Sequence, residues 1–272
     1  MIISLITATL GRTKEIERLL VSLSNQTFHD FEIIIVDQNS HHEVEELVKR
    51  YSSLNIRYIR SNKKGLSYNR NIGLSHVRGD IIGFPDDDCF YESNLLARVV
   101  EEFGKGGNQC KLVAVQAKDI SSDYIFVKCG RGPLTRNDFF KRCISINFFI
   151  RKETGMHFDE LLGVGAEYGS GEETDFLWEN VSADDECVFA RDTFVRHSYN
   201  TSPIDSGRAY RYGMGMGATF KKEVLMRKHY KMACRYVGLL IRSFGGMMIK
   251  KEHRFYWETL KGRIVGFVKY PV

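Results

Sequence analysis

The first 84 residues alternate between apolar runs and amphipathic segments, and this alternation limits the possible folds more than any other feature. The apolar or β-branched runs, typical of buried strands, are Ile2–Ala8, residues 31–40, residues 56–60 and Asp80–Phe84. The segments between them place apolar residues at helical intervals, at Lys14–Ser24, residues 44–51 and Asn69–Val77. This β-α-β-α order predicts the α/β class, with a mainly parallel sheet and helices on both faces.

Polar residues follow several of the expected strands at the point where each strand ends. They are Thr9, Asp37 and the triplet Asp86, Asp87 and Asp88. Ligands of such sheets bind beyond the carboxyl ends of the strands, so we expect these side chains to meet at one rim. Three adjacent carboxylates repel one another and are costly to desolvate, so some group must neutralise them.

Two interpretations of the aspartate triplet are open. One is a solvated acidic turn after a strand. The other is a site for Mn²⁺ or Mg²⁺, because both ions prefer oxygen ligands and complete their shells with water and substrate phosphates. A metal site of this kind implies a substrate that carries phosphate.

The regular alternation fades after the fourth strand. We expect a strand at 145–153, a glycine-rich loop running into a helix at 158–181, and a short strand at Cys187–Ala190. A linker-like passage at 198–208 precedes the C-terminal region. The chain is therefore predicted to contain a main domain over residues 1–206 and a helical appendage over residues 207–272.

The appendage is strongly basic. Residues 221–272 hold 13 Lys and Arg against three Glu, a net charge of +10, and the rest of the chain holds 26 basic and 31 acidic residues, a net charge of −5. Its runs without charge are too short to span a bilayer. Basic amphipathic helices with inserted aromatics lie at membrane surfaces, so we expect contact with an anionic membrane through Phe255, Tyr256, Trp257 and Phe267. An ordinary helix packed on the domain is the alternative.

Other features limit the setting. The six cysteines show no CxxC pair, which argues against a zinc site and a disulfide framework. The N-terminal apolar run lacks a basic region before it, and it is interpreted as a first strand instead of a signal peptide. No nucleic-acid-binding module is recognisable, so we expect no nucleic acid partner. The expected compartment is the cytoplasm.

Over roughly residues 1–200 the chain resembles the family-2 glycosyltransferases, which have the GT-A fold with a Rossmann-like sheet. The resemblance lies in the order and approximate spacing of the motifs TATLGR, FEIIIVDQNS, GLSYNRNIGL, GDIIGFPDDDC, GEETDF and VRH. It implies transfer of a sugar from a nucleotide diphosphate donor, with inversion at the anomeric carbon. It also implies a divalent metal cofactor, Mn²⁺ or Mg²⁺.

The resemblance implies a metal site at the aspartate triplet. Residues 86–88 match the DxD motif of the family, with Asp88 as the direct metal ligand and Asp86 as a ligand of ribose or of metal-bound water. Asp87 belongs to the same cofactor-binding set. His197 matches a histidine that completes the metal shell, although a lone histidine is also often an ordinary packed or surface residue.

The resemblance also implies a nucleotide site. Asp37 matches the carboxylate that accepts the N3–H of a pyrimidine base, and Thr9 matches the residue beneath the nucleotide. A strand-end turn and a buried threonine are the ordinary alternatives for these two. Arg70 matches the arginine that faces the diphosphate, and its alternative is an exposed helix arginine.

GEETDF resembles the Glu-Asp motif of the family, in which the second acid is the catalytic base. Glu173 stands at that position, and Glu172 and Asp175 are the alternative bases. Ser170 and Glu173 also have the spacing of a capping box, which starts a helix without any catalytic role.

The predicted activity is that of an inverting, metal-dependent glycosyltransferase. It would move a hexose from a nucleotide-sugar, expected to be a UDP-sugar, to a glycan or lipid-linked glycan at the inner face of the plasma membrane in bacterial surface-polysaccharide synthesis. Two other functions stay open. One is a non-catalytic nucleotide-sugar-binding protein in which Glu173 only caps a helix. The other is a sugar nucleotidyltransferase, which should carry a glycine-rich basic loop where this chain has TATLGR.

Overall fold

The structure is a computed structural model that describes residues 1–130, 133–199 and 205–271. The described residues form two compact units. The first comprises residues 1–64, 68–157 and 179–199, and the second comprises residues 65–67, 158–178 and 205–271. The expected linker at 198–208 lies partly outside the described residues, and the domain boundary after residue 206 stays a prediction.

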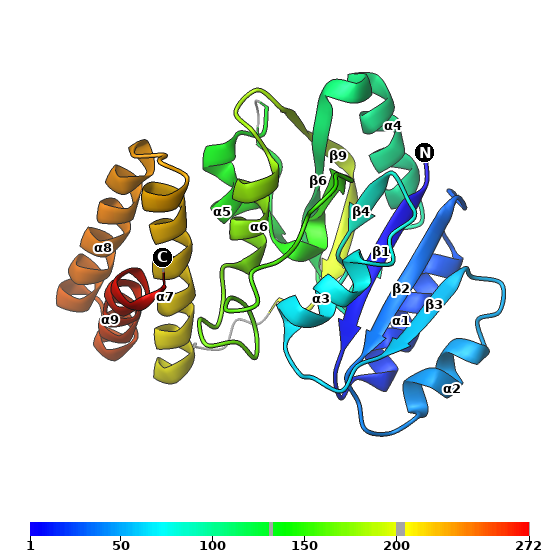
Figure 1. The fold of residues 1–272 in the computed structure, drawn as a ribbon, viewed down its shortest axis with the longest axis horizontal. Helices are drawn as coiled ribbons and strands as arrows, with labels where there is room; N and C mark the ends of the chain where they lie inside the picture. The colour runs from blue at the N-terminus through cyan, green and yellow to red at the C-terminus, as the bar shows by residue number, and fades with distance from the viewer. Residues whose placement is uncertain (131–132, 200–204, 272) are drawn as a thin grey trace. The chain divides into compact units, whose positions relative to one another are not determined.

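The N-terminal half of the sheet has the predicted alternation of strands and helices along the chain. Its parallel strands, in the spatial order β3-β2-β1-β4, are β1 (Ile3–Thr9), β2 (Phe31–Asp37), β3 (Ile56–Arg60) and β4 (Ile81–Gly83). The helices after the first three strands are α1 (Thr13–Ser24), α2 (Glu43–Lys49) and α3 (Leu66–Leu74). Thr9 pairs with Asp37 in the register of β1 and β2, so the two strand ends meet at one edge of the sheet, as expected (Figure 1).

Beyond β4 the sheet is mixed. The strands are β5 (Phe90–Tyr91), β6 (Cys110–Asp119), β7 (Ile125–Val127), β8 (Phe148–Arg151) and β9 (Glu186–His197). β8 runs antiparallel to both β4 and β6, and β9 runs parallel to β6. The intervening helices are α4 (Leu95–Gly106), α5 (Phe139–Arg142) and the 3-10 turns η1 (Gly107–Gln109), η2 (Arg136–Asp138) and η3 (Ser145–Asn147). Strands β5, β6 and β7 and helices α4 and α5 were not predicted from the sequence.

The short strand expected at Cys187–Ala190 was wrong in its length. β9 continues to His197, so the VRH motif ends a strand instead of following one. The pairing with β6 shifts register between Val115 and Gln116, whose partners are Ala190 and Phe194. The polar residues 191–193 therefore bulge out of the ladder, and pairing resumes after them. Polar residues at a bulge look like the end of a strand when only the sequence is examined.

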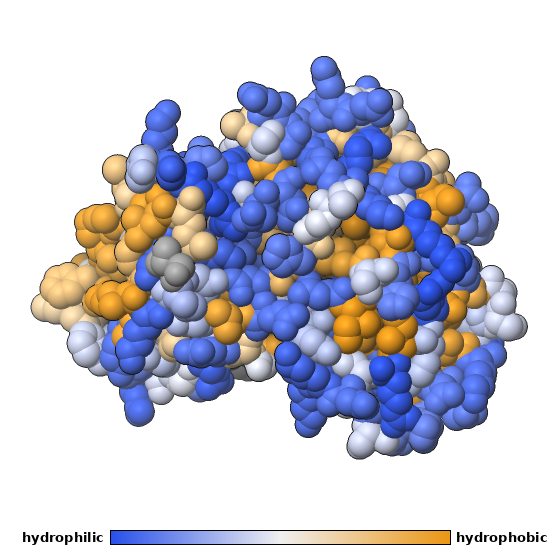
Figure 2. Space-filling model, viewed as in Figure 1, coloured by the Kyte–Doolittle hydropathy of each residue, from blue (hydrophilic) through white to orange (hydrophobic). Residues whose placement is uncertain are grey.

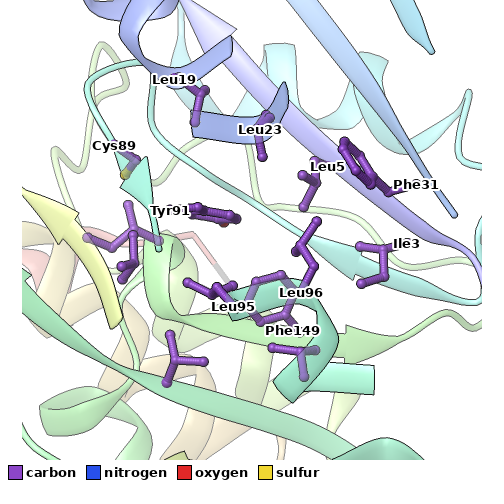
Figure 3. Close-up of a cluster of buried hydrophobic side chains, with 14 of the residues drawn as sticks. Ile3, Leu5, Leu19, Leu23, Phe31, Cys89, Tyr91, Leu95, Leu96 and Phe149 are labelled. Carbon is purple, nitrogen blue, oxygen red and sulfur yellow. The ribbon is translucent and has the colours of Figure 1, made fainter. Parts of the chain in front are cut away.

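Helices cover both faces of the sheet. Ile16, Leu19, Leu20 and Leu23 of α1 are buried at helical spacing and belong to the same core cluster as Leu5 of β1. Figure 3 shows Leu19 and Leu23 beside Leu5, with Leu95 and Leu96 of α4 in the same cluster. On the opposite face of β1, a Cβ at Gly73 of α3 would lie 2.3 Å from Cγ2 of Ile6, so α3 packs closely there.

The second unit is mainly helical. It contains α6 (Glu172–Asn180) as far as Trp178, then α7 (Ser206–Lys221), the π-helical turn η4 (Lys222–Met226), α8 (Lys231–Ile249) and α9 (His253–Lys269). The expectation of a helical C-terminal region is confirmed. In the described part of the chain, no helix combines the length and apolar character needed to cross a membrane.

Helices α7 and α9 contact one another through glycines. A Cβ at Gly217 of α7 would lie 2.1 Å from the carbonyl oxygen of Arg263, and a Cβ at Gly266 of α9 would lie 2.0 Å from that of Met214. Real Cβ atoms do not approach backbone oxygens so closely. The two helices therefore touch backbone to backbone, and only residues without a side chain fit at these positions.

We predict that Gly266→Ala destabilises the protein by about 1–3 kcal/mol, because the methyl group overlaps backbone that cannot rotate away. Gly245→Ala in α8 is the matched control, since a Cβ there would meet nothing within 4 Å. That change should be neutral or stabilise by up to about 1 kcal/mol through helix propensity. Chemical denaturation of both variants measures the difference, and equal stabilities would show that the α7–α9 contact is looser than described.

Candidate active site

The aspartate triplet lies just beyond β4, and three cationic side chains neutralise it. Nη2 of Arg70 lies 2.9 Å from Oδ1 of Asp86. Nη1 of Arg12 lies 3.0 Å from Oδ1 of Asp87 and 2.8 Å from Oδ2 of Asp88. Nε2 of His197 lies 3.0 Å from Oδ1 of Asp88. Each carboxylate thus has at least one cationic partner.

Two of the ordinary alternatives from the sequence are wrong. Asp87 and Asp88 are buried, so the triplet is not a solvated turn. Arg70 is also buried, with only 2% of its side chain exposed, so it is not an exposed helix arginine. The ion pair with Asp86 holds its guanidinium at the triplet.

Thr9 contacts the triplet directly. Its hydroxyl donates a hydrogen bond of 2.8 Å to Oδ2 of Asp87. Burial raises the pKa of Asp87 to about 6, while the hydrogen bond from Thr9 and the charge of Arg12 act in the opposite direction. The end of β1 therefore holds the middle carboxylate in place, and Arg12 holds it from the loop that follows β1.

Asp88 and His197 stabilise one another in their charged forms. Burial by itself raises the pKa of Asp88, but the contact with His197 and the charges of His197 and Arg12 outweigh it, so the pKa is lowered. Burial likewise lowers the pKa of His197, and the contact with Asp88 outweighs it, so that pKa is raised. This pairing depends on β9 reaching His197.

Three residues of the site could hold a metal ion. Asp86, Asp88 and His197 each offer one ligand atom, and these atoms lie within 4.8 Å of one another. Two ligands on opposite sides of Mg²⁺ are about 4.2 Å apart, so one ion could be held after a small movement of the side chains. Two carboxylates and one imidazole are suitable ligands for Mn²⁺ or Mg²⁺. The residues present therefore fit the metal that the sequence predicts.

Asp37 lies at the end of β2 and is fully buried. Its Oδ2 accepts a hydrogen bond of 2.8 Å from the hydroxyl of Tyr58. Its Oδ1 accepts hydrogen bonds from the backbone N–H and the side-chain amide of Asn39, at 2.9 and 2.7 Å. Burial, together with the hydrogen bond to Asp37, raises the pKa of Tyr58. The carboxylate is thus oriented by donors on both of its oxygens.

Sequence reasoning did not assign Arg12, Asn39 or Tyr58. Arg12 ends the quoted motif TATLGR, and its position next to Gly11 in the loop after β1 could have identified it as a rim residue. Asn39 stands two residues after Asp37, a spacing at which a carboxylate commonly accepts from the backbone. Tyr58 gave no local signal, because its partner comes from the neighbouring strand.

The acidic residues of α6 differ in their surroundings within the second unit. Asp175 is buried, and its two oxygens lie 2.7 Å from Nζ of Lys222 and 2.9 Å from Nη2 of Arg227. Glu172 is buried as well, whereas Glu173 is half-buried. Both oxygens of Asp175 are therefore engaged in ion pairs, an arrangement typical of a structural carboxylate.

The helix start does not match the capping box. The hydroxyl of Ser170 donates to the carbonyl of Tyr212, at 3.0 Å. The first bond of the helix runs from the N–H of Asp175 to the carbonyl of Gly171, which places the N-cap at Gly171. Glu173 is then one position too early to complete a capping box.

Comparison with known proteins matches most of the sheet to one family. The model described as glycosyl transferase family 2 matches residues 4–160. The uncharacterized glycosyltransferase EpsJ of Bacillus subtilis is 36% identical over 110 residues, which cover 40% of this chain and 31% of EpsJ. The GalNAc(5)-diNAcBac-PP-undecaprenol beta-1,3-glucosyltransferase of Campylobacter jejuni is 31% identical over 108 residues, which cover 38% and 35% of the two chains. The chain thus matches about a third of the length of these relatives.

Solved structures share the fold over the whole chain. S. aureus TarS 1–349 matches with a TM-score of 0.70 at 18% identity, and the match covers 98% of this chain and 81% of the TarS chain. The structure of TarS 1–349 in complex with UDP-GlcNAc matches with a TM-score of 0.64 at 14% identity, and the match covers 100% of this chain and 82% of the TarS chain. Mannosyltransferase PcManGT of Pyrobaculum calidifontis, in complex with GDP-Man and Mn²⁺, matches with a TM-score of 0.62 at 13% identity. The match covers 98% of this chain and 85% of the PcManGT chain. These similarities confirm the expected GT-A fold.

We predict that Asp175→Asn lowers the free energy of unfolding by about 3 kcal/mol, because it removes a buried charge that pairs with two cations at once. Lys222 then keeps its ion pair with Asp159, and Arg227 keeps its ion pair with Glu223. The control is Asp184→Asn, an exposed position after α6, where the change should stay within about 0.5 kcal/mol. Thermal and urea unfolding of both variants provide the measurement. If Asp175→Asn proves as stable as the parent, the ion pairs with Lys222 and Arg227 are not structural.

Proposed function

The chain belongs to glycosyl transferase family 2, and from this premise we propose that it moves a sugar from a UDP-sugar to a hydroxyl group of a glycan or lipid-linked glycan, with inversion at the anomeric carbon. The observation that carries the proposal is the cluster of Asp86, Asp88 and His197 beside the buried Arg70. Such a cluster combines ligands for a divalent ion with a cation for a diphosphate.

Two relatives support the finer parts of the proposal. TarS is solved with UDP-GlcNAc, which supports a UDP-sugar as the donor. The Campylobacter relative is named for an undecaprenol-linked glycan, which supports a lipid-linked acceptor. We place the reaction in surface-polysaccharide synthesis, at the cytoplasmic face of the membrane that would hold such an acceptor, with the basic C-terminal helices as the membrane contact.

The donor site is proposed as follows. Asp37 accepts the N3–H of uracil once a local movement exposes its carboxylate, which is fully buried in this structure; the described hydrogen bonds from Tyr58 and Asn39 use three of its roughly four acceptor sites. Arg70 binds the diphosphate. Asp88, Asp86 and His197 hold Mn²⁺ or Mg²⁺, which when bound stabilises the charge of the leaving diphosphate as a Lewis acid.

Glu173 is proposed as the general base. It removes the proton of the acceptor hydroxyl while the oxygen attacks the anomeric carbon on the side opposite the leaving diphosphate. Asp175 is engaged by Lys222 and Arg227, which favours Glu173 over it. The helix start at Gly171 also argues against a capping box as the reason for Glu173.

The proposed function is tested by release of UDP from candidate UDP-sugars, with and without glycan acceptors, in the presence of Mn²⁺. Acceptor-dependent release supports the proposal. Tight binding of a UDP-sugar with no release under any condition would instead identify a non-catalytic nucleotide-sugar-binding protein.

We predict that Glu173→Gln lowers the rate of transfer by ~10²–10⁴, as loss of a general base does, and leaves the affinity for UDP within a few-fold of the parent. Glu179→Gln is the matched control, because the same change is made at an exposed position of the same helix. Steady-state kinetics and calorimetry measure the two quantities. Full activity of Glu173→Gln would transfer the role of base to Glu172.

We predict that Mn²⁺ binds in the presence of UDP, and that Asp88→Asn weakens its binding by roughly tenfold or more, since even indirect changes around metal sites cost 10–100-fold. Asp30→Asn is the control, because Asp30 is exposed and lies outside the three-residue cluster. Calorimetry with Mn²⁺ and with EDTA is the measurement. Equal affinity for UDP under both conditions would mean that Arg12, Arg70 and His197 alone hold the diphosphate.

A further inference from the structure

The outer face of α8 is an exposed apolar stripe. Val237, Ile241, Phe244 and Met248 follow one another at intervals of four, three and four residues, which places them on one side of the helix. Each has at least half of its surface exposed, and Ile241 and Met248 reach 65%. Figure 2 shows hydrophobic surface gathered over α8.

Another face of α8, centred on Tyr236 and about 110° around the helix from the middle of the stripe, is firmly packed. Tyr236 is buried and stacks on both Phe220 and Phe267, with ring centroids 5.4 and 4.8 Å away. Its hydroxyl donates a hydrogen bond of 2.8 Å to the carbonyl of Arg263. The helix is thus anchored through one face, so the exposure of the stripe is a property of its folded position.

Within the described residues, no atom covers the outer face of α8 near Gly238 and Gly245. A Cβ at Gly238 or at Gly245 would meet no atom within 4 Å. An exposed stripe of large apolar side chains on an otherwise packed helix marks a contact with something outside the molecule.

The charge around the stripe identifies the kind of partner. Residues 224–251 contain seven Lys and Arg residues and no Asp or Glu. Arg235 and Arg242 are exposed and lie about 100–120° around the helix from Ile241 and further from Val237 and Phe244, on the side of α8 that faces away from the stripe. Lys250 and Lys251 follow the end of α8. A helix with an apolar stripe on one side and positive charge on the other complements acyl chains beneath anionic headgroups.

A second copy of the chain is a poorer partner for this face. A two-fold dimer would place the same patch on both sides of the interface. The positive charges would then face one another without any acid in the segment to compensate them.

We propose that α8 lies in the plane of an anionic membrane, with Val237, Ile241, Phe244 and Met248 below the headgroups and Arg235 and Arg242 at the level of the phosphates. The inference rests on the proposed function only in identifying this membrane as the one that holds the lipid-linked acceptor. A helix that lies on the membrane needs no span.

This assignment differs from the contact through α9 aromatics that the sequence predicts. Phe267 stacks on Tyr236, and the ring of Tyr256 packs against Gly246, whose Cβ would lie 2.3 Å from it. These side chains stabilise the helical unit instead of reaching outward. Trp257 of α9 is 47% exposed, so a contribution from α9 has to be tested beside that of α8.

The test compares two double variants of the full chain in binding to vesicles of phosphatidylglycerol and phosphatidylcholine. Ile241→Glu with Phe244→Glu changes the α8 stripe. Ile264→Glu with Val268→Glu is the matched control in α9, where Val268 is 68% exposed. The α8 variant should lose tenfold or more in vesicle affinity, and the control should stay within threefold. Unchanged melting temperatures verify that both variants fold.

A second pair of substitutions tests the charges. Arg235→Gln with Arg242→Gln should weaken binding to anionic vesicles by roughly tenfold or more, and high salt should weaken binding of the parent. Equal binding of the parent to vesicles of pure phosphatidylcholine would overturn the proposal. So would equal losses in the α8 and α9 variants, or a dimer in solution that the α8 variant dissociates.

The UDP-release assay with a soluble acceptor separates this inference from the proposed function. The α8 variant should keep the rate of the parent there, since no residue of the donor site or of α6 is changed. Vesicle binding without any transfer of sugar would contradict only the proposed function. Transfer of sugar without vesicle binding would contradict only the membrane proposal.

Discussion

Charge compensation of three adjacent carboxylates at the end of a buried strand is the constraint on which the active site depends. The compensating groups come from three different elements, Arg12 from the loop after β1, Arg70 from α3 and His197 from the end of β9. Each must reach the triplet for the site to be stable, because desolvated carboxylates without partners cost several kcal/mol. The order of the strands and the continuation of β9 past its bulge therefore both bring positive side chains to the aspartate triplet.

The acids of α6 have different roles: Asp175 is structural, and Glu173 is the proposed base. Asp175 is held by Lys222 at the start of η4 and by Arg227 just after it, and Arg227 also pairs with the buried Glu223. Buried ion pairs of this kind contribute little net stability but are costly to break. They connect α6 to the segment between α7 and α8 within the second unit. The basic C-terminal region thus supports the helix that carries Glu173, in addition to its proposed surface role.

One basic, apolar composition serves two purposes in the C-terminal helices. Glycines let α7 and α9 touch through their backbones, and the aromatic side chains of α8 and α9 fill the space around Tyr236. The apolar side chains that this packing does not use remain on the outside of α8. Composition alone does not separate the two sets, because both contain large apolar residues at helical intervals.

The sequence alone determined the parallel half of the sheet and the rim residues Thr9, Asp37 and 86–88, because burial on both faces imposes continuous apolar runs and each run ends visibly. It did not determine all the partners of those residues. The resemblance to the family brought His197 to the site of Asp88, but Arg12, which lies 76 positions from Asp88 (88 − 12), was not assigned, because no local pattern records such a pairing. The mixed half of the sheet, the length of β9 and the engagement of Asp175 likewise depend on strand register and helix packing. Those are set by contacts between distant segments, which only the tertiary structure brings together.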